Sequence, residues 1–516
     1  MSDFFANMFV SWFVIVPLLT ALAVVLVPAS QDRLIRWVSL VGAGVLVVLA
    51  GILCLRYAEA SAGDFEVLKD ALHTRLYFEE FVPWFASQGI NYRVGVDGIS
   101  VFMIVLTAII IFTGVLASWH VETRAKEFFA LLLVLVGGVF GVFISFDLFL
   151  FFVFYELAVL PMYLLIGVWG TGRKEYSAMK LTLMLLVGSA FVLVGMFAMY
   201  HASGLGTFDL LKLATVKFPL ALQQWAFPMI FIGFGVLGAL YPFHTWSPDG
   251  HAAAPTAVSM LHAGVLMKLG GYGALRIAIY LLPEGAKMWG VAFMALTTVN
   301  IVYGAFGAIS QKDLKYFTAY SSVSHCGFVL FGIATLNMIG LKGAVIQMFS
   351  HGIMTGLFFA LIGMVYGRTH TRQLDEMGGL AKVMPWLATC FYIAGLASLG
   401  LPGLAGFVAE SHVFLGGVFA NPWGDAVVMR ALTIIATMSI VITAVYVLRG
   451  LAKVFQGPIR NAEFSELSDA LVSERLATGI LVATLVVAGL GPFIFMDMIE
   501  HSLMPIVNRL HATGAF

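Results

Sequence analysis

Charged residues are scarce in this chain of 516 amino acids, at 11% of the total, whereas hydrophobic residues make up 61%. Soluble domains carry about 25% charged residues, so the composition excludes a soluble multi-domain protein. The 28 Lys and Arg balance the 28 Asp and Glu. No basic cluster of the kind that binds nucleic acid or an anionic partner is present.

Cysteine is nearly absent: Cys54, Cys326 and Cys390 each lie alone within a hydrophobic run. Isolated thiols form no C-x-x-C pair, so we expect no disulfide framework and no iron–sulfur, zinc or other metal site on this chain. The first run, which follows Met1-Ser2-Asp3, also lacks a basic segment before it and a small-residue cleavage site after it. It therefore predicts a retained helix and not a signal peptide.

Long apolar runs fill most of the chain, and runs of roughly 20 such residues can cross a bilayer. We expect an all-α polytopic membrane protein, with one membrane domain over 1–516 and about fourteen transmembrane helices. The gaps predict an extracytoplasmic loop at 58–95 and a cytoplasmic loop at 451–473. The spans are expected near 9–28, 34–57, 97–118, 127–145, 147–169, 177–200, 226–241, 255–282, 288–309, 314–336, 340–367, 384–400 with 403–420, 430–450 and 474–496.

Basic residues concentrate in the gaps that follow odd-numbered spans. By the positive-inside rule these gaps face the cytoplasm, which predicts that both termini lie outside it. The basic residues that carry this prediction include Arg33, Arg36, Arg124, Lys126, Arg173, Lys174, Lys312, Lys315, Arg368, Arg372, Lys382, Arg449, Lys453 and Arg460.

Two hydrophobic runs are interrupted by glycine and proline, near 233–245 and near 398–404. Paired interruptions in corresponding positions indicate discontinuous helices, inverted repeats and a binding site at the midplane. A kink that only serves helix packing is the alternative. The predicted repeats are helices 4–8 at 127–282 and helices 9–13 at 288–450.

Gly233, Gly235 and Gly238 match the G-x-G-x-x-G spacing of dinucleotide-binding loops. That fingerprint needs a preceding strand and a following helix in a βαβ unit. Here the glycines lie inside an apolar run that ends at Pro242, so we expect close helix packing and no bound nucleotide.

A few titratable residues lie inside the spans. A charge at mid-bilayer costs roughly 2.5–3.5 kcal/mol on insertion scales, so such residues usually serve transport. The candidates for proton transfer are Glu156, Lys180, His262, Lys268, His325, His351 and Glu410.

Lys268 lies in the middle of its span, too deep for its ammonium group to reach the interface. Glu156 lies nine residues after the helix start expected at Asp147, about 13 Å into the bilayer. A structural ion pair with a neighbouring helix is the alternative for Glu156. Lys180 is one turn inside its span, so snorkelling to the cytoplasmic surface remains open for it.

His325 and His351 each follow a serine near mid-span, which suggests a hydrated path. A merely hydrogen-bonded core histidine is the alternative for each. Glu410 follows the second interruption, where we expect it to serve as an exit group. Asp147 and Asp249 lie at span ends, where capping or solvated roles are expected.

Several motifs, spread over essentially the whole chain, resemble one family. It is the antiporter-like subunit M, or chain 4 type, of bacterial proton-pumping NADH:quinone oxidoreductase, respiratory complex I. The matching stretches are Tyr92-Arg-Val-Gly-Val-Asp97-Gly98-Ile-Ser100, Phe154-Tyr-Glu156-Leu-x-x-x-Pro161, Pro242-Phe-His244-x-Trp246-x-Pro248-Asp-x-His251, Ala254-Pro255-Thr256-Ala257, Leu266-Met-Lys268-Leu-Gly-Gly-Tyr272-Gly273, Lys312-Asp313-x-Lys315-x-x-x-Ala319-Tyr320-Ser321 and Leu401-Pro402-Gly403.

The resemblance implies a translocase subunit with no redox active site of its own. Glu156 and Lys268 would be pump residues, His325 and His351 would lie on a central axis, and Glu410 would lie at the exit. NAD, FMN, iron–sulfur clusters and quinone are implied on partner subunits. The implied partners are antiporter-like neighbours on both sides and the lipids of the bacterial inner (plasma) membrane.

One position departs from the family. A lysine usually precedes the Pro-x-His-x-Trp motif of helix seven and pairs with the helix-five glutamate, but Leu237 stands there. His262 and Lys180 are the candidates to replace it. Two other functions remain open: a subunit of a multi-subunit sodium/proton antiporter, or a spacer subunit that no longer pumps.

Overall fold

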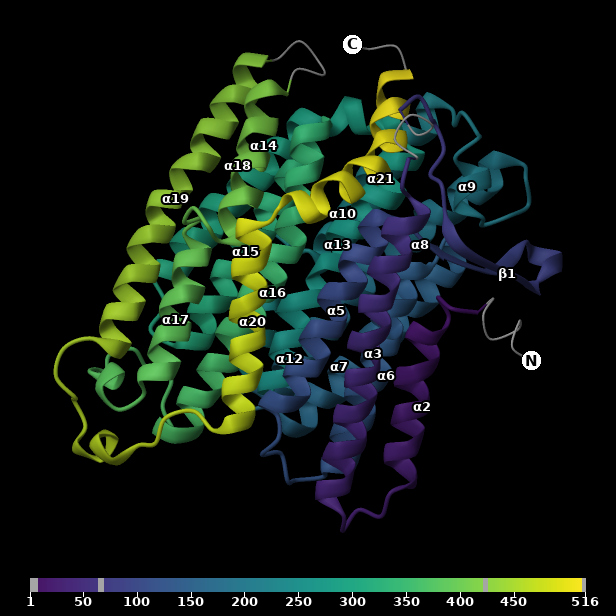
Figure 1. The fold of residues 1–516 in the computed structure, drawn as a ribbon. Helices are drawn as coiled ribbons and strands as arrows, with labels where there is room; N and C mark the ends of the chain where they lie inside the picture. The colour runs from purple at the N-terminus through teal and green to yellow at the C-terminus, as the bar shows by residue number, and fades with distance from the viewer. Residues whose placement is uncertain (1–7, 64–68, 421–425, 513–516) are drawn as a thin grey trace.

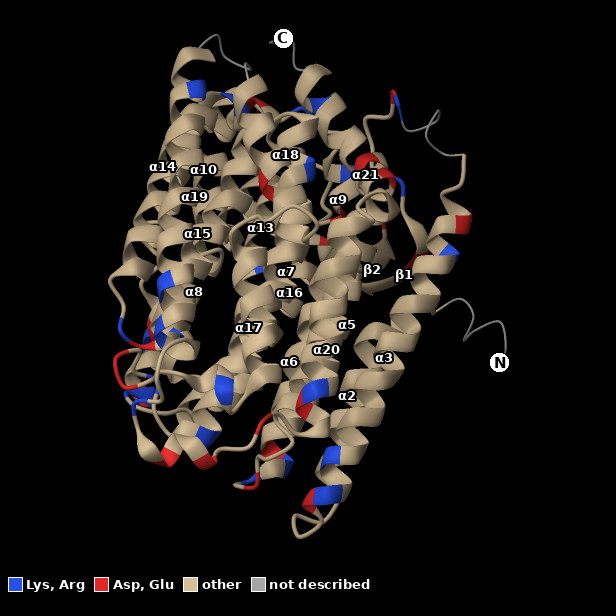
Figure 2. Ribbon diagram, turned by 60° about the vertical axis from the view of Figure 1, so that its left-hand side comes forward, with Lys and Arg blue, Asp and Glu red and all other residues tan. Residues whose placement is uncertain are grey.

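The computed structural model describes residues 8–63, 69–420 and 426–512, which form a bundle of long helices (Figure 1). The outermost residues of both termini, which we predicted to be extracytoplasmic, lie outside these ranges. Most charged residues lie near the two ends of the bundle, and the long middle stretches of the helices carry few (Figure 2). The apolar runs of the sequence thus become the membrane-crossing part of the molecule.

Within the described residues, eleven helices are long and apolar enough to cross a membrane. They are α3 (Asp32–Ala60), α5 (Gly98–Ala117), α6 (Ala125–Ile144), α7 (Leu148–Trp169), α8 (Lys174–Ser203), α10 (Leu220–Leu237), α14 (Pro283–Ile309), α15 (Leu314–Ala334), α16 (Met338–Thr369), α19 (Ala426–Phe455) and α20 (Val472–Leu490).

Three further spans are shorter or interrupted. The first is α2 (Trp12–Leu26). The second is a composite helix that contains two π-helical segments, and the third is a broken pair. With these counted, the described residues hold the fourteen spans that we expected. The composite helix is α12 (Thr256–Leu261), η2 (His262–Leu266), α13 (Met267–Gly273) and η3 (Ala274–Ile279), and the broken pair is α17 (Pro385–Ser398) and α18 (Ala405–Phe419).

Both predicted interruptions are present. α10 ends at Leu237 and α11 (Trp246–Ala253) resumes after a break, while the second break separates α17 from α18. At the first break, side chains form hydrogen bonds with backbone groups that have no partner within a helix. The Trp246 indole donates to the Val236 carbonyl at 2.9 Å, and Asn300 Oδ1 accepts from the Tyr241 amide at 2.7 Å. Such pairing is what allows irregular backbone at membrane depth.

Two aspartates begin helices in the same way in the two halves of the chain. Asp147 accepts from the first-turn amides of α7, and Asp313 accepts from those of α15. Each also forms an isolated bridge with the segment after the next long helix, Asp147 with Asp209 and Asp313 with Gln373. Five spans lie between the two capping aspartates. Because an odd number of crossings ends on the other side, the two aspartates lie at opposite ends of the bundle. The capping role expected for Asp147 is confirmed.

One of the glycines with dinucleotide-like spacing, Gly233, packs two helices together, as predicted for these glycines. A Cβ at Gly233 would lie 2.6 Å from the carbonyl oxygen of Gly188 on α8. Gly233 therefore allows α10 to approach α8 closely, whereas Gly235 lies against Leu240 and Gly238 against Gly270.

Two strands and two helices were not predicted. The loop at 58–95 contains an antiparallel hairpin, β1 (Tyr77–Phe85) and β2 (Ile90–Val96), in which Val82 pairs with Tyr92. A short helix, α9 (Leu210–Leu213), follows α8, and α21 (Phe493–Ala512) follows α20.

α21 rises obliquely from the end of α20 over the upper part of the bundle, against α16 and α5 (Figure 1). It is amphipathic, because Asp497, Glu500 and Arg509 interrupt its apolar residues, and a search for apolar runs therefore misses it. Lys342 on α16 forms an ion pair with Glu500, which ties α21 to the bundle.

Candidate functional site

Lys268 lies at the centre of the molecule, on α13 between the two π-helical segments, and is 1% exposed. π-helical turns alter the hydrogen-bond ladder of a helix and occur frequently at functional sites. Here the Ala263 carbonyl within η2 accepts a hydrogen bond from Lys268 Nζ. The same Nζ lies 2.8 Å from Nδ1 of His351 on α16. The sequence predicted the depth of Lys268 but neither the π-turns nor this contact.

A row of buried side chains continues from Lys268 into the second half of the chain. The rings of His351 and His325 stack with centroids 5.3 Å apart. His325 Nδ1 lies 3.5 Å from Glu410 Oε1 and 3.2 Å from Nε2 of Gln347. Four of the predicted residues therefore meet, in the order Lys268, His351, His325, Glu410. Each is at most 4% exposed.

Glycines bring the two helix breaks against this row. Gly400 has a φ of +65°, and a Cβ there would lie 2.6 Å from Glu410 Oε2. Only glycine adopts that conformation readily and leaves room for the carboxylate. A Cβ at Gly270 would lie 2.5 Å from the Phe234 carbonyl and 2.6 Å from the Gly238 amide nitrogen, so α13 contacts the first break closely.

Two histidines lie between Lys268 and the end of the bundle that carries the α11–α12 junction. The rings of His251 and His262 are 4.3 Å apart, and His262 also stacks on Trp246 at 5.0 Å. The ring nitrogens of both histidines have no hydrogen-bond partner among the described residues. Buried polar groups are normally paired with protein or water, so these rings are suited to a hydrated path. The sequence analysis proposed His262 but did not propose His251.

Lys180 forms an ion pair with Asp249 on α11, with 2.7 Å between Nζ and Oδ2. Tyr316 donates to the other oxygen of Asp249 at 3.1 Å. The Lys180 and Asp249 side chains are 22% and 25% exposed, which places them at the rim of the site. Asp249 is therefore an ion-pair partner as well as a residue near a helix start.

Glu156 lies half-buried on α7, with Ser189 of α8 as its hydrogen-bonding neighbour. In the part of the chain that the structure describes, no ion pair joins Glu156 to a basic side chain. Leu237, where the family has lysine, is fully buried. Lys180 pairs with Asp249, and the His262 ring lies against Trp246 and His251, so the structure does not bear out either of them as the base that pairs with Glu156.

A buried ion pair lies toward the opposite end of the composite helix. Arg276 in η3 pairs with Asp97, the N-cap residue of α5, and contacts the rings of Tyr272 and Phe146. Tyr272 in turn bonds Ser100 at 3.0 Å and donates to the Phe143 carbonyl at 3.1 Å. Because a buried charge is costly unless paired, this cluster fixes α5 against the composite helix. In the sequence, the scarcity of charged residues did not by itself point to this ion pair.

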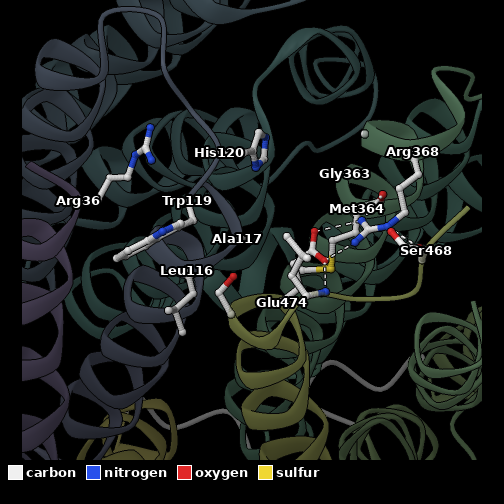
Figure 3. Close-up of a pocket in the computed structure, with 13 residues that line it drawn as sticks. Arg36, Leu116, Ala117, Trp119, His120, Gly363, Met364, Arg368, Ser468 and Glu474 are labelled. Atoms are coloured by element: carbon white, nitrogen blue, oxygen red, sulfur yellow. Dashed lines mark hydrogen bonds and ion pairs between the residues drawn. The ribbon is translucent and has the colours of Figure 1, made fainter. Parts of the chain in front are cut away.

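A cavity of about 490 Å³ lies apart from the row, where α3, α5, α16 and α20 meet (Figure 3). Arg36, Trp119 and His120 line one side. Arg368 and Glu474, which form an ion pair at 2.6 Å, line the other. None of the four residues of the buried row lines this cavity. The volume of the cavity therefore does not identify it as the functional site.

Helices of membrane-spanning length, two of them broken, surround a contiguous row of lysine, histidine and glutamate. These features define a multi-pass membrane protein of the antiporter-like class. The family described as "NADH:quinone oxidoreductase/Mrp antiporter, TM" matches residues 145–443. The chain therefore belongs to the NADH:quinone oxidoreductase/Mrp antiporter family, and within it to the chain 4 type.

The chain 4 type follows from a close relative. The sequence is 38% identical over 499 residues to NAD(P)H-quinone oxidoreductase chain 4 1 of Picosynechococcus sp., covering 96% of this chain and 91% of that one. This likeness confirms the resemblance to subunit M that the motifs indicated.

Solved structures show the same fold. A chain of the respiratory complex I from Thermus thermophilus with bound NADH matches with a TM-score of 0.86 and 28% identity, covering 97% of this chain and 99% of that chain. A chain of the Mrp complex from Dietzia sp. matches with a TM-score of 0.82 and 20% identity, covering 98% and 99%. The second likeness shows the fold alone.

Proposed function

We propose that this chain moves protons across the membrane as an antiporter-like subunit of a redox-driven NAD(P)H-quinone oxidoreductase. The observation that carries the proposal is the unbroken row Lys268, His351, His325 and Glu410. Each of these side chains can take up and release a proton, and the membrane interior tolerates such groups chiefly where they serve transport.

The path begins at Lys180 and Asp249, because these are the partly exposed members of the set. His251 and His262 lie next and connect this rim to Lys268 through groups that water can hydrate. From Lys268 the proton passes along the two stacked histidines to Glu410, the exit group.

Control of this path rests on electrostatics. In a medium of low dielectric constant, charges interact strongly over short distances. A change in charge near Lys268 therefore changes how strongly its amine binds a proton, because a fully buried lysine is little screened by solvent. Conformational or charge changes in neighbouring subunits would supply that signal, while redox chemistry takes place elsewhere in the complex.

The first half of the chain works without the family's helix-seven lysine. Among the described residues, Glu156 has Ser189 as its hydrogen-bonding neighbour and no basic partner, so its protonation would respond to hydration and to charges arriving from a neighbouring subunit. Glu156 remains part of the proposed path as the titratable group of α7.

We assign the inverted repeats to 127–282 and 288–450, supported by the matching aspartate caps at opposite ends of the bundle. The basic loops would face the cytoplasm and the β-hairpin the other side, in the bacterial inner (plasma) membrane. NAD, FMN, iron–sulfur clusters and quinone would belong to partner subunits, with antiporter-like chains as the nearest neighbours.

Replacing sodium in the medium tests the proposal against the antiporter alternative. In vesicles that hold the intact complex, we expect the initial rate of redox-driven proton uptake to be the same in sodium-containing and in sodium-free, potassium-containing buffer. The physical reason is that every group in the row exchanges protons. Uptake that requires sodium, or sodium efflux that accompanies it, would favour a sodium/proton antiporter instead.

A further inference from the structure

A second polar connection joins the histidine row to the loops at the cytoplasmic end of the bundle. It runs through Tyr446 of α19, which is 1% exposed and is not needed by the path proposed above. The Tyr446 hydroxyl bonds Ser321 of α15 at 2.9 Å, and the Thr443 and Ser398 hydroxyls lie near it. Ser398 in turn contacts His325, with 3.1 Å between Oγ and Nε2.

The other side of Tyr446 lines a small cavity of about 80 Å³. A water molecule occupies about 30 Å³ of liquid, so this space is large enough for water. The cavity lies between the α14–α15 loop and the end of α19, which are segments that the basic residues assign to the cytoplasmic side. Its lining includes Gln311, Lys312, Asp375, Tyr446, Arg449 and Lys453.

Asp375 supplies a carboxylate at the mouth of this cavity. It forms an ion pair with Lys453 and is 54% exposed. The hydrogen bond and the charge of Lys453 hold the pKa of Asp375 below its usual range, so the carboxylate stays ionised. An ionised carboxylate at the surface can collect protons from the solvent.

Tyr272 is a second buried tyrosine with which the surroundings of Tyr446 can be compared. Tyr446 packs edge-to-face on Phe317 at 5.2 Å, much as Tyr272 packs on Phe143 at 5.1 Å, and each bonds a serine hydroxyl. Tyr272, however, also donates to a backbone carbonyl beside the Asp97–Arg276 pair, which fixes its hydroxyl. Tyr446 instead lies between a cavity and a histidine, so its hydroxyl can both accept and donate a proton.

From this arrangement we propose that Tyr446 and Ser398 form a second cytoplasmic proton inlet, which delivers protons to His325 without passing Lys180, His251 or Lys268. A hydronium ion in the cavity, formed with a proton from the cytoplasm, would give its proton to the Tyr446 hydroxyl oxygen and leave as water, while the hydroxyl proton moves to Ser398. Ser398 would pass its own proton to His325 Nε2. Every group except His325 regains its original state, so no other reactant is needed. The inlet rests on the proposed function, since it supplies the same row.

The test measures redox-driven proton uptake by the intact complex in vesicles for Tyr446→Phe, for Lys180→Ala and for the double variant. Tyr446→Phe keeps the ring against Phe317 and removes only the hydroxyl. We expect about a twofold loss in each single variant, because the two inlets share the flow, and nearly complete loss in the double variant. Ser398→Ala interrupts the same link one step further in and should match Tyr446→Phe.

The matched control is Tyr392→Phe. The Tyr392 hydroxyl accepts a hydrogen bond from Gln456 at 2.8 Å at the cytoplasmic end of the bundle, outside the row. This variant should pump like the wild type, and equal amounts of assembled complex are confirmed for all variants. A double variant that pumps as well as Lys180→Ala alone overturns the inlet.

Lys268→Met separates the inlet from the proposed function. If Lys268→Met stops uptake while Tyr446→Phe and Ser398→Ala pump like the wild type, the proposed function stands and the inlet is wrong. If Lys268→Met and Glu410→Gln both leave uptake intact, the row carries no protons and both ideas fall together.

Discussion

Lys268→Met in the Tyr446→Phe background is expected to lower redox-driven proton uptake at least about tenfold, and about twofold where the Tyr446 inlet still works, because a positioned proton-transfer group is lost. Methionine fills nearly the same space as lysine, so the π-turns around residue 268 should persist. What disappears is the group that accepts a proton beside the Ala263 carbonyl and His351. The measurement is the initial rate of proton uptake during NADH oxidation by the intact complex in vesicles.

Lys268→Arg separates charge from proton transfer. Arginine keeps the positive charge but does not deprotonate in proteins, so it should fail almost as completely as methionine. The matched control is Lys174→Met, since Lys174 is partly exposed at the start of α8 and, among the described residues, donates to the Val168 carbonyl. Normal pumping by Lys268→Arg would mean that a fixed positive charge is enough and that Lys268 does not carry the proton.

Glu410→Gln is expected to have the second largest effect. Glutamine keeps the size and most hydrogen-bonding ability of the side chain at the break beside Gly400, but it cannot take up and release a proton. Protons reaching His325 would then find no acceptor 3.5 Å away, and uptake should fall about tenfold or more. The measurement is again redox-driven uptake, together with the amount of assembled complex.

His412→Gln is the local control for this prediction. His412 lies two residues after Glu410 and bonds the Val408 carbonyl of its own helix at 2.7 Å. Because none of its described hydrogen bonds or ion pairs joins it to the row, its replacement should leave uptake near the wild-type rate. Equal losses in both variants would indicate a packing defect in α18 and not the loss of an exit group.

The sequence predicted the members of the row because a charge or histidine inside a long apolar run is conspicuous. Lys268, His325, His351 and Glu410 all emerged in this way. Their contacts could not be predicted, since each comes from a different helix and the order along the row is set by packing. The two π-segments that flank Lys268 also have no signal in residue periodicity.

Other residues were missed because they carry no charge or lie outside the apolar runs. His251 belongs to the short helix α11, between a break and the next span, where a search for apolar runs does not look. Tyr446 resembles any tyrosine that packs against a helix. Its importance depends on Ser398, which lies 48 positions away in the chain at the end of α17.

The departure at Leu237 was visible in the sequence, but its consequence needed the structure. The sequence suggested His262 or Lys180 as a replacement base for Glu156. Folding directs Lys180 to Asp249 and His262 to Trp246 and His251. These alternatives depend on which face of each helix meets which neighbour, which is a property of the packed bundle.

The number of protons pumped per NADH oxidised by the intact complex, with His351→Gln beside the wild type, tests the central claim most directly. His351 is the only described link between Lys268 and His325, and glutamine at this position can hydrogen-bond but cannot relay a proton as imidazole does. The row predicts fewer protons per NADH, while electron transfer from NADH to an artificial acceptor stays at the wild-type rate. An unchanged number of protons per NADH would contradict the account, because protons would then cross without passing along the row.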